Sequence, residues 1–126
     1  MRKITLFFCF LSLIACLKKD NDDSPIGTWK LNSIMINRAQ HILSECEKEE
    51  KIVFIEKTFS SYAYKLGTCE KEFIENIPYE ISNKKLNFSI LGNKFSFGFR
   101  VFRDSMTITA IENRDTIVKH YFKQYN

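Results

Sequence analysis

The chain has 126 residues, of which 44% are hydrophobic, and a formal charge of +4. This length suits one domain with a modest core. Twelve Phe and five Tyr against four Gly and two Pro favour pleated strands, so we expect an all-β protein. The small charge comes without a long Lys/Arg stripe, which argues against a nucleic-acid-binding protein.

Residues 1–15 have the pattern of a bacterial export signal. The positive start Met1-Arg2-Lys3 precedes twelve mainly apolar residues, too few to cross a bilayer as a helix. The sequence Leu13-Ile14-Ala15-Cys16 follows and resembles the lipobox of bacterial lipoproteins. That resemblance implies cleavage before Cys16 and acylation of this cysteine, which would hold the protein on a membrane without spanning it. An ordinary signal peptide with a chance cysteine is the alternative.

The polar segment LKKDNDDS at residues 17–24 has too few apolar side chains to fold, so residues 16–24 are expected to form a lipidated, flexible tether. It resembles the lysine-containing acidic segment that directs some lipoproteins of Gram-negative bacteria to the cell surface. We therefore expect a lipid-anchored protein of the outer membrane, exposed on the cell surface if this segment acts in the same way. Loss of Arg2 and Lys3 with the signal would leave a net charge of +2.

From residue 28 onward, alternating apolar and polar residues predict short strands that each bury one face. In chain order the predicted strands are 28–36, 52–55, 58–66, 73–81, 85–90, 94–101, 105–110 and 116–123. Short polar connectors between the later strands predict an antiparallel meander. Residues 37–50 interrupt the pattern and are predicted to form a loop with at most one helical turn.

Five of these strands have specific expected inward faces, and in the strands 85–90, 94–101 and 105–110 these are Leu86, Phe88 and Ile90, then Phe95, Phe97, Phe99 and Val101, then Met106, Ile108 and Ala110. The residues expected to face the core are Trp29, Leu31 and Met35 in the first strand and Phe73, Ile77, Tyr79 and Ile81 in the fourth. Pro78 lies inside the fourth strand and lacks the amide hydrogen that a sheet requires. It predicts an edge strand or a bulge there.

Cys46 and Cys69 remain once Cys9 has left with the signal and Cys16 carries lipid. In an exported protein such a pair is expected to form a disulfide, which would connect the 37–50 loop to the turn near Gly67. The alternative is a metal site that combines both thiolates with His41 or His120. No Cys-x-x-Cys or close His spacing supports it.

Eight antiparallel strands in about 100 residues, opening with Gly27-Thr28-Trp29 and containing Cys46 and Cys69, resemble the lipocalin-like domain of small Gram-negative lipoproteins. The resemblance covers residues 25–126 and implies a small, antiparallel, eight-stranded up-and-down barrel of the calycin type. In that pattern Trp29 packs at the closed end. The chain is shorter than larger lipocalins and has no room for their usual C-terminal helix.

Aromatic residues form the candidate ligand site that this resemblance implies, at or in the barrel mouth. The candidates are Tyr62, Tyr64, Tyr79, Phe88, Phe95, Phe97 and Phe99. These side chains could bind a small hydrophobic molecule, or they could simply fill a barrel whose interior is just wide enough for side chains.

The sequence contains no recognisable catalytic apparatus, metal-ligand spacing or cofactor motif, so we expect a non-enzymatic protein without a cofactor. We expect a monomer that meets the membrane through its N-terminal lipid, binds a small hydrophobic ligand and has no nucleic-acid partner. The alternative function is a structural or protein-interaction module with a filled core. Such a module would bind or inhibit an envelope protein through its outer face.

Overall fold

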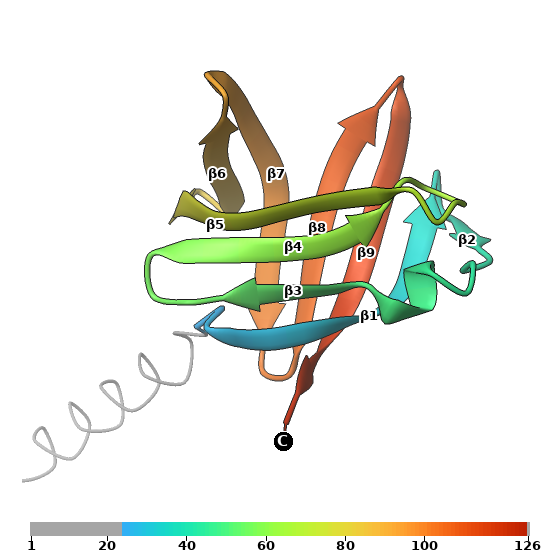
Figure 1. Ribbon diagram of the computed structural model, residues 1–126, viewed down its shortest axis with the longest axis horizontal. Helices are drawn as coiled ribbons and strands as arrows, with labels where there is room; N and C mark the ends of the chain where they lie inside the picture. Colours follow the sequence, from blue (N-terminus) through green and yellow to red (C-terminus); the bar gives the residue numbers. More distant parts are fainter. Residues whose placement is uncertain (1–23, 126) are drawn as a thin grey trace, which may run out of the picture.

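The computed structural model describes residues 24–125 and folds them into one closed antiparallel sheet (Figure 1). The strands are β1 (Gly27–Ile36), β2 (Ala39–His41), β3 (Lys51–Phe54), β4 (Thr58–Tyr64), β5 (Lys71–Ser82), β6 (Lys85–Ile90), β7 (Asn93–Phe102), β8 (Ser105–Glu112) and β9 (Asp115–Gln124). The predicted signal, Cys16 and all but the last residue of the predicted tether lie outside the described residues. Within residues 24–125, no helix is long and apolar enough to span a membrane.

Pairing of the first and last strands closes the barrel. The strand order is β2-β1-β3-β4-β5-β6-β7-β8-β9, and β1 also pairs with β9. Figure 1 shows β3, β4 and β5 crossing in front of the steeper strands β7, β8 and β9. This arrangement confirms the predicted eight-stranded barrel and adds β2 as an extra strand outside it.

A bulge in β1 changes which of its residues face the core. The register with β9 shifts between Leu31 and Ser33, so one residue drops out of the alternation. Trp29 and Leu31 are buried as predicted, but beyond the bulge Ile34 is buried and Met35 is not. The prediction that Met35 faces the core was therefore wrong.

A second irregularity lies in β5, next to Pro78. Phe59 pairs with Ile77 but Ser61 pairs with Ile74, so β5 contains an extra residue, and Asn76 has a positive φ of 55°. Because β5 pairs with strands on both sides, the edge-strand alternative was wrong and the bulge alternative was right. The bulge also moves Phe73 to the exposed outer face, contrary to the prediction that it shares an inward face with Ile77.

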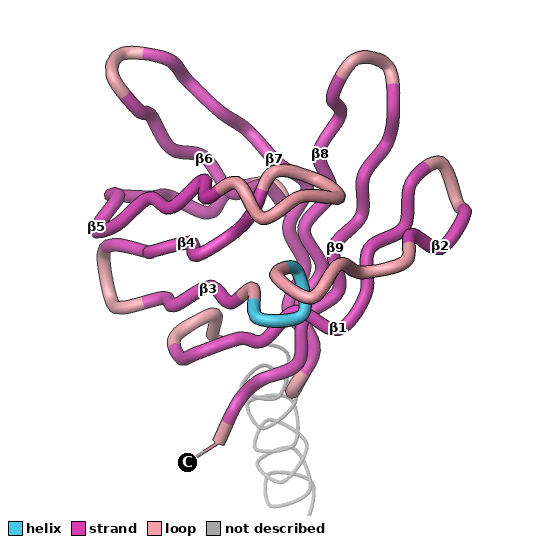
Figure 2. Tube along the Cα trace, turned by 45° about the vertical axis from the view of Figure 1, so that its right-hand side comes forward, coloured by secondary structure: helices cyan, strands magenta, loops and turns pink. Residues whose placement is uncertain are grey.

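Residues 37–50 contain more regular structure than the expected loop. Asn37 and Arg38 both have positive φ and turn the chain back, so that β2 pairs with the end of β1. The Asn37 side chain accepts a hydrogen bond from the Thr116 amide at 2.9 Å and donates one to Asp115 at 2.8 Å. The expected helical turn is the 3₁₀ helix η1 (Glu47–Glu49), drawn in cyan in Figure 2.

The core fills the half of the barrel where the chain enters. Trp29 is fully buried there, and its indole N–H donates to the Pro25 carbonyl at 2.7 Å. Phe54 packs against Phe59 and Phe99 with ring centroids 5.5 and 5.6 Å apart. Side chains therefore fill the barrel interior in this half.

Candidate functional site

A cavity of about 160 Å³ lies inside the barrel, away from Trp29. Its apolar wall comes from β4 to β8 and includes Phe59, Ile74, Leu86, Phe88, Phe97 and Ile108. Glu72 at the start of β5 and Glu112 at the end of β8 also line it, and both are exposed. The cavity therefore reaches solvent at the end of the barrel where β5 begins and β8 ends.

The opposite side of the cavity has a buried ion pair. Lys119 on β9 points inward, and its Nζ lies 2.9 Å from Oε1 of Glu50. Glu50 is 1% exposed, and its Oε2 accepts a hydrogen bond from the Tyr64 amide at 3.1 Å. Lys119 keeps 21% of its side-chain surface exposed. The pair is thus held by hydrogen bonds and reaches solvent on the lysine side.

Tyr121 lies two residues after Lys119 and faces the same cavity. It is 4% exposed, and the side-chain hydrogen bonds found among residues 24–125 include none to its hydroxyl. Burial and, secondarily, the negative charge of Glu50 raise the pKa of Tyr121 far above its ordinary range. Its hydroxyl therefore stays protonated and remains a hydrogen-bond donor.

Three of the seven aromatic residues predicted as a ligand site line this cavity. They are Tyr64, Phe88 and Phe97. The polar residues Glu50, Lys119 and Tyr121 were not predicted as site residues. Alternation along β9 could have predicted that Lys119 and Tyr121 point inward, because both are in phase with the buried Ile117.

The other four predicted aromatic residues lie elsewhere. Tyr79 packs edge-on against Phe54 in the filled half, and its hydroxyl donates to the Ile55 carbonyl at 3.1 Å. Phe99 is buried in the same half. Tyr62 lies on the outer face against Phe73, and Phe95 is partly exposed and stacks on Phe88. The structure therefore does not bring the seven together into one site.

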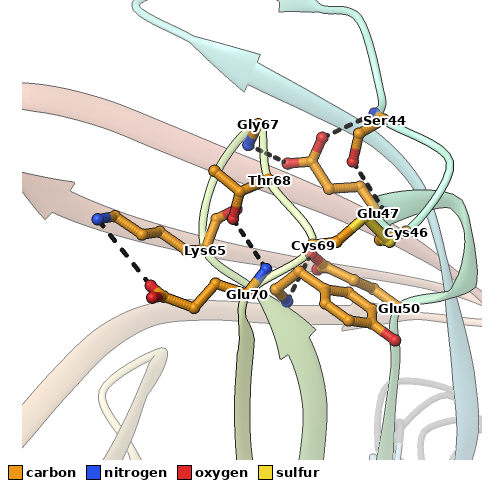
Figure 3. The surroundings of a disulfide bond; sticks show 10 residues. Ser44, Cys46, Glu47, Glu50, Lys65, Gly67, Thr68, Cys69 and Glu70 are labelled. Carbon is orange, nitrogen blue, oxygen red and sulfur yellow. Dashed lines mark hydrogen bonds and ion pairs between the residues drawn. A yellow bond between two sulfur atoms is a disulfide. The ribbon is translucent and has the colours of Figure 1, made fainter.

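A disulfide fastens the segment that follows β2 to the turn between β4 and β5 (Figure 3). Cys46 and Cys69 are bonded, with their Cα atoms 5.3 Å apart, which confirms the predicted pairing. Both thiols are used by this bond, so the alternative metal site built on them fails. His120 lies beside Thr107, and His41 contacts Glu47 instead.

Glu47 reinforces the same connection from inside. Its carboxylate is fully buried and accepts hydrogen bonds from the amides of Ser44 at 2.8 Å and Gly67 at 2.9 Å (Figure 3). It also contacts His41 Nε2 at 3.0 Å. Burial alone would raise the pKa of Glu47, but these hydrogen bonds outweigh it and hold the pKa below its usual value. Glu47 is thus a charged bridge between the two segments at the cavity end of β4.

Comparison with known protein families supports the fold. A model of the lipocalin-like domain family matches residues 26–113, which run from just before β1 to the turn after β8. No curated protein and no solved structure matches the chain significantly. Strand β9, which carries Lys119 and Tyr121, lies beyond the matched residues.

Proposed function

Because the chain belongs to the lipocalin-like domain family, generally a non-enzymatic binding fold, we propose that it binds a small hydrophobic ligand in the cavity of its barrel. The main support for this proposal is the cavity inside the barrel. One half of the barrel is packed with side chains, whereas the other half keeps an apolar-walled cavity that reaches solvent. Concave, mostly apolar sites with a few polar groups are typical of small-molecule binding.

Filling the cavity tests this function. Ala110 faces the cavity from β8, so Ala110→Phe is expected to abolish the binding of toluene to the purified chain. Binding is measured from chemical-shift changes of the Ile108 and Ile117 methyl groups. Ile111→Phe is the matched control, because Ile111 is the next residue and points into solvent. Unchanged toluene binding in a folded Ala110→Phe variant would contradict the proposal.

A protein-interaction function has support of its own from the loop tips at the cavity end. Leu91 is 97% exposed in the turn between β6 and β7, although its positive φ is unusual for Leu. Ile42, just after β2, and Ile111, near the end of β8, are also strongly exposed. Exposed aliphatic side chains that lie at the same end of the barrel suit contact with an envelope protein. This alternative gains weight if the Ala110→Phe experiment finds no ligand-binding cavity.

We further propose that the protein is anchored to the outer membrane through acylated Cys16. The lipobox-like sequence supports this, and the fold is compatible with it. Strand β9 begins beside Glu112 at the cavity opening and ends at Gln124, which pairs with Thr28. A ten-residue strand is about 30 Å long. The chain therefore enters the barrel at the end opposite the opening, and an anchor there leaves the opening free.

Replacing the lipid-bearing residue tests the anchor. Cys16→Ala is expected to move the protein from the membrane fraction to the soluble fraction, because two lipid attachments are needed for stable anchoring without a spanning helix. The measurement is fractionation of cells that express the wild-type or variant chain. Cys9→Ala is the control, since Cys9 belongs to the signal that is removed. Retention of Cys16→Ala on membranes would refute lipidation.

A further inference from the structure

The volume of the cavity limits the size of the ligand more strongly than membership of the family does. Its volume of about 160 Å³ is close to that of an engineered cavity of about 150 Å³ that holds benzene. Pockets for drug-sized ligands occupy about 300–1,000 Å³. A single ring or a short chain therefore fills this volume, whereas most of a long acyl chain would lie outside it.

Tyr121 supplies the feature that distinguishes one such small molecule from another. It is more than nine-tenths buried, lines the cavity and has no hydrogen-bond partner among residues 24–125. Every fully inaccessible side-chain oxygen or nitrogen of those residues does have a partner. The hydroxyl of Tyr121 therefore keeps some accessible surface, and the cavity is the space that can provide it. A donor in this position is best satisfied by an acceptor atom on a ligand.

The charges around the cavity disfavour anions. The ammonium group of Lys119 is already neutralised by Glu50. No cation of the described residues lies within ion-pair distance of Glu72 or Glu112 at the opening. A carboxylate ligand would thus lose its hydration and meet two uncompensated negative charges.

We propose that the cavity selects small uncharged molecules with one apolar ring or short chain and one hydrogen-bonding oxygen, which the Tyr121 hydroxyl contacts. This inference rests on the proposed ligand-binding function. It adds to that function a size limit, a preference for neutral ligands and a specificity-determining residue. Tyr121 lies on β9, outside the residues that the family model matches.

Phenol and toluene test the inference, because they have nearly the same shape and differ by a hydroxyl in place of a methyl group. Their binding to the purified full chain is followed by the methyl chemical shifts of Ile108 and Ile117. Tyr121→Phe is expected to weaken phenol binding roughly fivefold, the effect of one neutral hydrogen bond, and to leave toluene binding unchanged. Benzoate is expected not to bind.

Tyr79→Phe is the matched control, because Tyr79 donates to a backbone carbonyl in the filled half and does not line the cavity. It is expected to leave both affinities unchanged. A magnetisation-transfer contact between bound phenol and the Tyr121 ring in the wild-type chain gives a second readout that needs no variant. Absence of this contact would overturn the inference.

The outcomes separate this inference from the function on which it rests. If neither phenol nor toluene shifts the cavity methyl groups, the proposed ligand-binding function fails. If toluene binds but Tyr121→Phe leaves phenol affinity unchanged, the role of Tyr121 is refuted while the cavity stands. Benzoate binding as tight as phenol binding would refute the preference for neutral ligands.

Discussion

Replacing Lys119 with Met is expected to lower the free energy of unfolding by about 3 kcal/mol. The change removes the cation 2.9 Å from Glu50 and leaves that carboxylate at 1% exposure, with the Tyr64 amide as its remaining hydrogen-bond donor. A buried charge without its partner is one of the strongest single causes of destabilisation. Urea unfolding at pH 7 measures the effect.

Two further variants show whether the stability lost in Lys119→Met comes from breaking the ion pair. Glu50→Gln is expected to cost about 1 kcal/mol, because Lys119 is partly exposed and a Gln oxygen can still accept from the Tyr64 amide. The double variant Lys119→Met/Glu50→Gln is expected to recover most of the stability lost in Lys119→Met. If Lys119→Met costs no more than Glu50→Gln, the charge of Glu50 does not depend on Lys119.

Removing the disulfide by Cys46→Ser is expected to lower stability by about 3 kcal/mol, because the bond joins two residues 23 positions apart and so closes a long loop in the unfolded chain. For a domain of this size the melting temperature falls by more than about 10 °C under non-reducing conditions. Thermal unfolding followed by circular dichroism gives the value.

The controls for this prediction use the other cysteine and a reductant. Cys69→Ser and the double variant Cys46→Ser/Cys69→Ser are expected to match Cys46→Ser, since each removes the same bond. A reductant is expected to destabilise the wild-type chain and to leave the three variants unchanged. An unaltered melting temperature in Cys46→Ser would show that the buried Glu47 contacts alone hold the two segments together.

The eight barrel strands could be predicted because strands such as β6, β7 and β8 alternate apolar and polar residues and short polar connectors separate the later strands. In two strands, however, the alternation does not show which residues face the core. The bulge after Leu31 exchanges Met35 for Ile34 in the core, and the bulge at Asn76 turns Phe73 outward. Pro78 marked the second irregularity, but its neighbours do not say where the extra residue lies. Strand β2 is short and mostly exposed, so it carries no burial pattern.

The aromatic residues of the cavity wall could be predicted from the sequence, but its buried ion pair could not. Phe88 and Phe97 lie in regular strands, and their inward direction follows from alternation. Glu50 lies between η1 and β3, so its burial depends on how that connection folds back under the disulfide. Its pairing with Lys119, 69 positions later in the chain, is set by barrel closure, and no local pattern contains it.

The pairing of β1 with β9 also determines when during folding the cavity comes into existence. Each of the strands β3 to β8 pairs with the next strand in sequence, whereas Leu31 must meet Tyr121 across most of the chain. Contacts between such distant residues carry the largest loop-closure entropy and are expected to form late. The cavity is therefore expected to be incomplete until the last strand has docked, so binding of the proposed ligand would report that folding is complete.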